Sequence, residues 1–216
     1  DLMVKWAEKI LRKNPHHITL LSPFVTYFFT FFAGTGHVAY SVLPVIAEVA
    51  KDTGIRPERP LGIAVIASQQ AITASPISAA TVAMLSMLAG YNISLFDILK
   101  ISIPCTLAGV LLGALYSMKV GKELKDDPEY QRRLATGEIS GDGYHTTEVA
   151  SHGKALTSVI LFLAATIGIV LFGSIDGLRP TFTTAQGEVQ MEMSHIIEVL
   201  MLSAASLILL FTKTDG

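Results

Sequence analysis

Long stretches without any acidic or basic side chain constrain this sequence more than any other feature. Asp, Glu, Lys and Arg are absent from residues 61–89, from residues 101–118 and from residues 155–175. An apolar run of about 18 residues or more is long enough to cross the hydrocarbon core of a bilayer as one helix. The sequence therefore predicts an all-α polytopic membrane protein, with the lipid bilayer as its surroundings, and excludes an ordinary soluble domain.

Composition supports this class and removes two others. Charged residues make up 16% of the 216 residues and the net charge is -2, whereas soluble chains carry about 25% charged residues. We expect no nucleic acid as a partner, because the basic residues are not concentrated on one face. Cys105 is the only cysteine. An internal disulfide is therefore excluded, and we expect this thiol to pack as a small buried hydrophobic group.

Residues 1–17 are predicted to form an amphipathic helix that stops at Asn14-Pro15. Apolar side chains, Trp6 among them, alternate along it with lysine, arginine and glutamate. A basic amphipathic helix beside a membrane segment is typical of the membrane interface, where its apolar face enters the headgroup region. We therefore expect an interfacial helix, with a plain cytosolic linker helix as the alternative.

Residues 18–50 are apolar but too long for one straight span of about 20 residues. Their middle is interrupted by Gly34-Thr35-Gly36-His37, and glycine allows the backbone angles of a tight turn. The pattern predicts two short helices that meet at a glycine tip, which is a re-entrant helical hairpin. A turn that only reverses the chain is the alternative for this tip.

Residues 61–89 form a second long apolar stretch, and its middle contains hydroxyl and amide side chains together with Pro76. Proline has no N–H and disfavours helix at the preceding residue, which is Ser75. We therefore predict a discontinuous transmembrane helix. The alternative is a continuous helix whose serines and threonines only hold neighbouring helices together.

The rest of the chain is predicted to consist of conventional membrane helices and one loop. The helices are expected at residues 96–118, 155–175 and 193–211, and the cytoplasmic loop at residues 119–154. Basic residues concentrate in this loop, in residues 1–17 and in residues 51–60, and basic loops remain in the cytoplasm. Residues 18–50 must then enter and leave on the same side, which agrees independently with a hairpin.

Two interruptions in succession indicate a binding site at membrane depth. Non-helical backbone survives there only when it is buried in protein or lines a wet cavity. A hairpin tip that meets a broken helix is typical of secondary transporters, and the N-termini of half-helices hold anions through their amides and dipoles. The predicted substrate-binding residues are Thr35, Gly36, His37, Ser68, Gln69, Gln70, Thr73, Ser75 and Ser78.

The sequence contains no recognisable catalytic motif and no cluster of metal ligands, so we expect neither an enzyme nor a metal site. A membrane hydrolase that pairs Ser68 or Ser75 with His37 is the remaining enzymatic alternative. We expect no cofactor, and H⁺ or Na⁺ is the candidate coupling ion.

Four strings resemble the anaerobic C4-dicarboxylate transporter family, Dcu. The most specific are FAGTGHVAYSVLPVIAEVAKDTGIRPERP at residues 32–60 and ASQQAITASPISAA at residues 67–80. AEKILRKNP at residues 7–15 and LKDDPEYQRRL at residues 124–134 are also similar. The histidine after the glycine tip and the RPERP connection resemble the DcuB-type branch more than the DcuA-type branch.

The resemblance implies a multi-pass protein of the bacterial inner membrane that exchanges fumarate, malate or aspartate for succinate during anaerobic respiration. It also implies an inverted-repeat secondary transporter of the ion-transporter superfamily, of which this chain would be the first half, without its first helices. A homodimer and a sensor histidine kinase are the implied protein partners. Two other functions stay open at this point. They are a cation-coupled carrier of another organic anion and a dicarboxylate-sensing membrane regulatory subunit.

Overall fold

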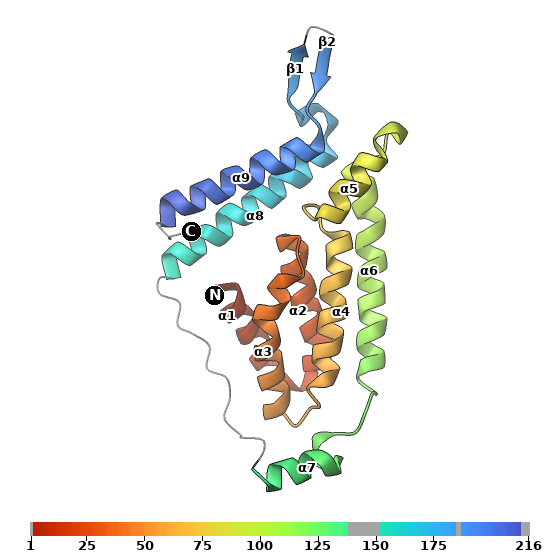
Figure 1. Ribbon diagram of the computed structural model, residues 1–216, viewed down its shortest axis with the longest axis vertical. Helices are drawn as coiled ribbons and strands as arrows, with labels where there is room; N and C mark the ends of the chain where they lie inside the picture. The colour runs from red at the N-terminus through yellow and green to blue at the C-terminus, as the bar shows by residue number, and fades with distance from the viewer. Residues whose placement is uncertain (1, 138–151, 185–186, 213–216) are drawn as a thin grey trace.

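The computed structural model of the chain describes residues 2–137, 152–184 and 187–212, and helices dominate these residues (Figure 1). Residues 138–151 of the predicted cytoplasmic loop lie outside the described residues. The helices are α1 (Leu2–Lys13), α2 (Ile18–Ala33), α3 (His37–Asp52), α4 (Glu58–Ala74), α5 (Ala79–Met87), α6 (Leu95–Ser117), α7 (Pro128–Ala135), α8 (His152–Ser174) and α9 (Met193–Thr212). Short 3₁₀ turns occur at Pro15–His17, Ala89–Tyr91, Leu124–Asp126 and Asp176–Leu178.

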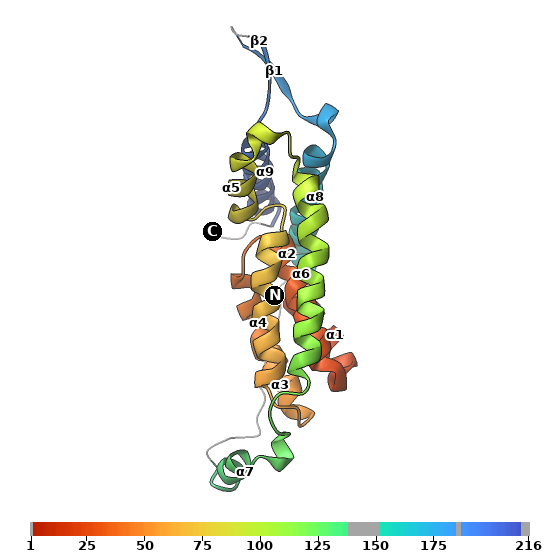
Figure 2. The same ribbon diagram turned by 90° about the vertical axis from the view of Figure 1, so that its right-hand side faces the viewer.

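A small β-hairpin joins α8 to α9 within a fold that is otherwise all-α, as predicted. Strand β1 (Thr181–Thr184) pairs antiparallel with β2 (Gly187–Gln190), and Phe182 faces Val189 across the ladder. Threonine, phenylalanine and valine favour strands, because their side chains fit a pleated surface. The hairpin lies at the end of the molecule opposite α7 (Figure 2).

Among the described residues, three helices are long and apolar enough to cross a membrane, which agrees with a polytopic membrane protein. The spans are Leu95–Ser117 in α6, Gly153–Gly173 in α8 and Met193–Phe211 in α9. Few of their residues are buried within the chain, and large apolar side chains such as Leu112 and Leu202 are exposed. Such faces are stable against lipid, where apolar surface has no water to avoid.

Helix α2 packs between α3 and α4, and α6 runs beside α4 and also contacts α2 (Figure 1). The face of α4 toward α2 and α6 consists of small residues, which let helix backbones approach closely. These residues are Ala64, Ala67, Ala71 and Ala74, all fully buried. Ser22 Oγ donates to the carbonyl of Pro60 at 3.1 Å, and Thr26 Oγ1 donates to that of Ala64 at 2.9 Å.

Helix α6 joins this group through polar and apolar contacts, and its Val110 is buried against Ala67 and Ala71. The hydroxyls of Tyr27 and Thr106 are 2.8 Å apart. Gly113 lies against α4, since an added Cβ would be 2.8 Å from Ile63 Cδ1. Cys105 is exposed on α6, so the expectation of a buried thiol is wrong for this chain. An apolar run does not reveal which of its faces turns toward protein and which toward lipid.

Helices α8 and α9 form an antiparallel pair that runs obliquely to the α2–α6 group (Figure 1). The pair meets α6 near its first turn, where an added Cβ on Gly173 would lie 2.6 Å from Leu95 Cδ2. An apolar cluster fills this joint, with Leu95, Leu99, Ile169, Met193, Ile196 and Ile197 as its buried members.

Helix α1 docks on α3 through an apolar stripe and one arginine. Ala7 and Leu11 are fully buried. Arg12 pairs with Glu8 of its own helix and with Glu48 of α3, both at 2.8 Å. These carboxylates raise the pKa of the Arg12 guanidinium above its ordinary value, mainly through the hydrogen bond with Glu48.

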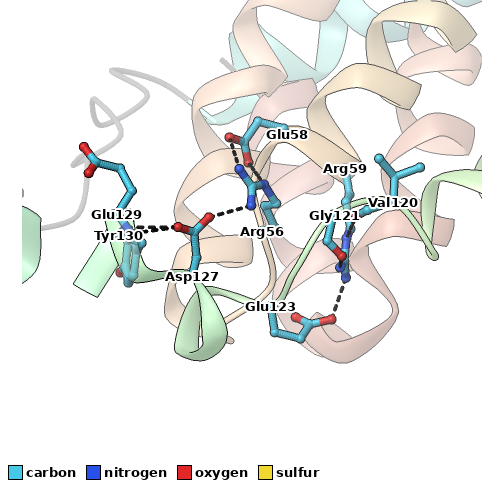
Figure 3. A network of polar contacts seen from close by, with 9 residues as sticks. All are labelled: Arg56, Glu58, Arg59, Val120, Gly121, Glu123, Asp127, Glu129 and Tyr130. Atoms are coloured by element: carbon cyan, nitrogen blue, oxygen red, sulfur yellow. Dashed lines mark hydrogen bonds and ion pairs between the residues drawn. The ribbon is translucent and has the colours of Figure 1, made fainter. Parts of the chain in front are cut away.

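A network of ion pairs joins the connection before α4 to the segment after α6 (Figure 3). Arg56 pairs with Asp127 at 2.7 Å and with Glu58 at 3.1 Å. The buried Arg59 side chain pairs with Glu123 at 2.6 Å and also donates to the carbonyls of Val120 and Gly121. Both connections therefore lie at the same end of the molecule.

Candidate functional site

The turn between α2 and α3 is a tight glycine tip. Gly34 follows the last residue of α2 with φ of 69°, and its N–H donates to the carbonyl of Thr30 at 2.8 Å. This left-handed conformation is costly for residues that have a Cβ. Gly36 caps α3, which begins at His37. The sequence of the tip thus ends one helix and starts the next within three residues.

The break between α4 and α5 follows from proline and serine chemistry. Ser75 is extended, with φ of -77° and ψ of 132°, as expected for the residue before Pro76. Helix restarts because Ser78 is an N-cap, and its Oγ accepts from the Thr81 N–H at 3.2 Å. The chain therefore has two helix interruptions, one in the hairpin and one in the α4–α5 segment.

The two interruptions are in direct contact. A Cβ added to Gly34 would lie 2.7 Å from Ile77 Cγ1 and 3.1 Å from the Ile77 carbonyl oxygen. Ser75 Oγ donates to the carbonyl of Phe31 in the last turn of α2 at 2.6 Å. At Gly36, an added Cβ would be 2.9 Å from Gln69 Nε2. Figure 1 shows the tip of the hairpin beside the α4–α5 turn.

This junction brings together four helix ends of both polarities. The N-termini of α3 and α5 begin there, at His37 and Ala79, and the C-termini of α2 and α4 end there. Free amides and a partial positive charge characterise a helix N-terminus, and free carbonyls characterise a C-terminus. The junction can thus attract an anion with one pair of ends and a cation with the other.

Three of the nine predicted residues are buried and already hydrogen-bonded. Ser68 Oγ donates to the carbonyl of Val65 in its own helix at 2.7 Å. Ser75 binds the hairpin and Ser78 caps α5, as described above. All three side chains are at most 1% exposed, so their roles in the fold are defined without a ligand. The prediction that they bind substrate stays a prediction.

The other six predicted residues remain accessible around the junction. Gln69, Gln70 and Thr73 are exposed on one face of α4, and His37 is exposed at the start of α3. Thr35 and Gly36 are partly exposed, and Thr35 Oγ1 accepts weakly from the His37 N–H at 3.4 Å. Among the residues that the structure describes, neither glutamine amide has a hydrogen-bond partner. These groups are therefore available to a ligand.

Sequence reasoning missed two polar residues beside this face. Tyr40 and Ser41 are exposed on α3, and the Tyr40 ring lies 5.9 Å from the His37 ring, centroid to centroid. Their spacing of three and four residues from His37 was the available signal, because it places them on the same face of a helix.

The chemistry of the junction does not suit a hydrolase. Ser68 and Ser75 donate to backbone carbonyls rather than to His37, so the nucleophile and base of the enzymatic alternative are not paired. Within the described ranges, no three His, Cys, Asp or Glu side chains gather as a metal site would require.

A separate cavity of about 630 Å³ lies between the α5–α6 connection and the base of the β-hairpin. Its lining includes Arg179, Glu192, Asn92 and Ser94. Sequence reasoning did not identify it, because its walls come from three segments that have no common motif.

Comparison with known proteins identifies the family. The model of the anaerobic C4-dicarboxylate membrane transporter family, DcuA/DcuB, matches residues 1–216. The chain is 44% identical over 216 residues to the C4-dicarboxylate transporter DcuA of Escherichia coli (strain K12), covering all of this chain and 49% of the relative. It is 43% identical to DcuA of Wolinella succinogenes over 215 residues, covering 48% of that relative.

The anaerobic C4-dicarboxylate transporter DcuB of Escherichia coli O6:H1 is 37% identical over 224 residues, with 49% of it covered. The identities are thus higher for the DcuA relatives, and they do not support the sequence-based preference for the DcuB branch. The chain spans about half the length of the curated relatives it matches. No solved structure matches it. The family match over every residue establishes that this chain belongs to the DcuA/DcuB family of anaerobic C4-dicarboxylate membrane transporters, a family of carriers rather than enzymes.

Proposed function

We propose that this chain supplies half of the substrate site of an antiporter in the bacterial inner membrane. The carrier exchanges fumarate, malate or aspartate for succinate. The single observation that supports this most is the contact between the hairpin tip and the α4–α5 break, at Gly34 and Ile77. Such a junction gathers helix ends and polar side chains in a region otherwise made of apolar helices.

The carboxylates of the substrate are held by helix dipoles and uncharged side chains. Each helix N-terminus carries about half a positive elementary charge, so the ends of α3 and α5 together offset about one carboxylate charge. No lysine or arginine occurs between residues 14 and 50 or between residues 60 and 99. The amides of Gln69 and Gln70 and the hydroxyl of Thr35 add hydrogen-bond donors. Thr73 adds a further donor when its hydroxyl turns away from the Gln70 carbonyl, to which it donates at 2.7 Å.

The exposed face around the junction is completed by the remainder of the carrier. Gln69, Gln70 and Thr73 are accessible in this chain, and an uncovered row of amides and hydroxyls is costly against lipid. The curated relatives are about twice as long as this chain, which leaves enough sequence for a second, similar half. Transport is then a rocking or elevator movement of the site against a scaffold. A homodimer and a sensor histidine kinase are proposed partners.

The membrane placement of the hairpin is part of this proposal. Residues 51–60 and 119–127 lie in the cytoplasm, α1 lies in the interface, and the α2–α3 hairpin is re-entrant. The pairs Arg56–Asp127 and Arg59–Glu123 support this placement, because they hold both connections at one end of the molecule. Cysteines placed at Arg56 and Lys125 are expected to react from the same side of the membrane. Labelling from opposite sides would exclude the hairpin.

The decisive functional test is counterflow in proteoliposomes with the full-length protein. Gln70→Ala and Thr73→Ala are expected to abolish exchange of fumarate for radiolabelled succinate while the protein still inserts in the membrane. Ser86→Ala is the matched control, since this exposed hydroxyl donates only to the Val82 carbonyl of its own helix. Undiminished exchange in both site variants would remove these residues from the site.

A cation-coupled carrier is the second candidate, because one observation favours it. The C-termini of α2 and α4 also reach the junction, and their free carbonyls are suitable ligands for Na⁺. Uptake that requires an inward Na⁺ gradient would favour this candidate, and exchange at full rate without Na⁺ would favour the antiporter.

A further inference from the structure

The carbonyl of Phe31 has an unusual donor. It lies in the last turn of α2, where the helix has no amide four residues ahead to donate to it. Ser75 Oγ, which is 44 residues away in sequence, donates to it at 2.6 Å. Ser75 is fully buried, and among the residues that the structure describes its hydroxyl is the donor that this carbonyl has.

Ser68 of α4 provides a direct contrast to Ser75, which follows the last residue of that helix. Both serines are buried in the contact surface of α4, and both were predicted to bind substrate. Ser68 Oγ donates to the Val65 carbonyl of its own helix at 2.7 Å, and that carbonyl already has a helical partner. Only the Ser75 hydroxyl joins the two interruptions to each other.

The seam between α2 and α4 is hydrogen-bonded along its length. Ser22 donates to the Pro60 carbonyl, Thr26 donates to the Ala64 carbonyl, and Ser75 donates in the opposite direction to Phe31. Of these three bonds, the one from Ser75 lies at the junction. It sits beside the contact of Gly34 with Ile77.

We propose that Ser75 is a positioning residue, which locks the hairpin tip onto the α4–α5 break so that the N-termini of α3 and α5 keep a fixed spacing. Its hydroxyl does not bind the substrate. The inference rests on the proposed function, since it concerns how the same site is held in shape. It also makes the tip and the break a single unit, which moves together during transport.

Loss of this bond has a distinctive kinetic signature. Without its donor, the Phe31 carbonyl is left unsatisfied in a buried place, and the tip separates more often from the break. When only a fraction of the molecules has the binding-competent arrangement, the apparent affinity for substrate falls by that fraction. A high substrate concentration shifts all molecules into the competent arrangement. The apparent KM therefore rises while Vmax is maintained. A variant that merely lowered the amount of folded protein would lower Vmax and leave KM unchanged.

The test compares Ser75→Ala, Ser75→Thr and Thr166→Val in the full-length protein. Thr166 is the control because its buried hydroxyl donates to the Phe162 carbonyl of its own helix, α8, at 3.1 Å. Succinate counterflow in proteoliposomes gives KM and Vmax, and hydrogen exchange in detergent without substrate reports on the amides of residues 33–37. We expect Ser75→Ala to raise KM and the rate of hydrogen exchange at the tip by about tenfold each, because a buried carbonyl left without any donor is worth roughly a factor of ten. Ser75→Thr retains the hydroxyl and is expected to stay within about threefold of wild type, as is Thr166→Val.

Three results would overturn the positioning role of Ser75. Ser75→Ala that matches Thr166→Val in both measurements would overturn the positioning role, as would a fall in Vmax at constant KM. Weak binding in Ser75→Ala with unchanged tip exchange would also overturn it, because the hydroxyl would then act on the substrate directly. Hydrogen exchange needs no substrate. If the proposed function is wrong, the wild-type protein will show no succinate counterflow. The hydrogen-exchange rates of the tip can still be compared between the variants in that case.

Discussion

The α2–α4 seam and the α8–α9 pair join helices in opposite ways. The seam uses small residues such as Ala64 and Ala67, and side-chain hydroxyls that reach across to backbone carbonyls. In the α8–α9 pair the described hydroxyls of Thr157, Ser158 and Thr166 bond within α8 itself. The pair meets α6 through bulky apolar side chains around Leu95. The interrupted segments, α2–α3 and α4–α5, therefore pack with their backbones close together. The continuous helices α8 and α9 pack through ordinary apolar side chains.

The difference teaches where polar groups can be concentrated at membrane depth. A hydroxyl that donates to a carbonyl on another helix fixes the distance between the two helices, whereas apolar side chains permit small shifts. The seam thus suits a site that must keep its geometry. The α8–α9 pair suits a support that contacts lipid.

Gly34→Val is expected to have the largest effect on the α2–α4 seam, because it disrupts the contact between the hairpin tip and the α4–α5 break. It places a β-branched residue at φ of 69° and its Cβ 2.7 Å from Ile77 Cγ1. We expect the free energy of unfolding to fall by more than about 2 kcal/mol, from strain and overlap together, and succinate exchange to be lost. Thermal unfolding of the purified protein and counterflow measure the two effects. Gly109→Ala is the control, because nothing lies within 4 Å of its added Cβ. Wild-type behaviour of Gly34→Val would show that the tip does not need its contact with the break.

Gly173→Ala tests the other side of the comparison. Its Cβ would lie 2.6 Å from Leu95 Cδ2 and 3.0 Å from Leu95 Cβ, so the α6–α8 joint must shift, at a cost of about 1–3 kcal/mol. We expect a lower melting temperature with little change in the KM for succinate, because the predicted substrate-binding residues lie outside the apolar cluster of this joint, which reaches the α4–α5 break through Ile77. Gly168→Ala, whose Cβ would be 3.5 Å from Leu200, serves as the control. A large rise in KM would mean that the pair shapes the site after all.

Thr26→Val tests the contribution of one hydroxyl of the α2–α4 seam, because valine has nearly the same volume as threonine but no hydroxyl. Thr26 Oγ1 donates across the seam to Ala64 at 2.9 Å, and interhelical bonds of this kind contribute about 0.6 kcal/mol in membrane proteins. The matched variant Thr157→Val loses a bond within α8, to the Gly153 carbonyl at 3.0 Å, and should leave stability unchanged. Both are measured by unfolding in mixed detergent. Equal effects would mean that the direction of these bonds is unimportant.

The smallest expected effect concerns the far end of α4, where Arg56 pairs with Asp127. The Tyr130 N–H and Arg56 hold the pKa of Asp127 below its ordinary value, and the partner carboxylate raises that of Arg56. A carboxylate with a lowered pKa stabilises the fold above its ordinary pKa of about 3.9, and this stabilisation is lost as pH falls through the lower value. A spin label on α7, at Leu134→Cys, should thus become more mobile only below about pH 4.

Asp127→Asn keeps the helix cap but loses the charge, so the label is expected to be slightly more mobile already at pH 7. Asp126→Asn is the control, as Asp126 makes no ion pair with another described residue. A label that responds identically in both variants would remove the Arg56–Asp127 pair from the attachment of α7. In that case the ion-pair network would have no measurable role at this end of α4.

Much of the local structure could be predicted, because single residues determine it. Pro76 prevents helix at Ser75, and Gly34 permits the left-handed turn, so both interruptions follow from sequence alone. Their mutual contact does not, since it depends on how closely α2 approaches α4. The alanines that allow this approach are indistinguishable in sequence from those of any apolar helix.

The sequence predicted the candidate site only as one set of residues. The structure divides this set into buried serines with roles in the fold and accessible residues around the junction. Ser68, Ser75 and Ser78 share one side-chain chemistry and lie within one segment, yet one bonds within its helix, one joins the hairpin and one caps α5. The role of each buried serine depends on which backbone carbonyl the fold brings next to its hydroxyl, and that carbonyl can be distant in sequence. Cys105 illustrates the same point for apolar segments, because lipid and protein interiors favour the same residue types.

Arg59 gives the α4–α5 segment one fixed end. Its guanidinium binds the carbonyls of Val120 and Gly121 just after α6, so the foot of α4 is tied to the foot of its neighbour. Further along, the segment has a joint at Ser75 and Pro76. The Ser75–Phe31 bond fixes this joint to the hairpin. Helix α4 is therefore held at both of its ends, and a force applied to α5 reaches α4 and the hairpin together.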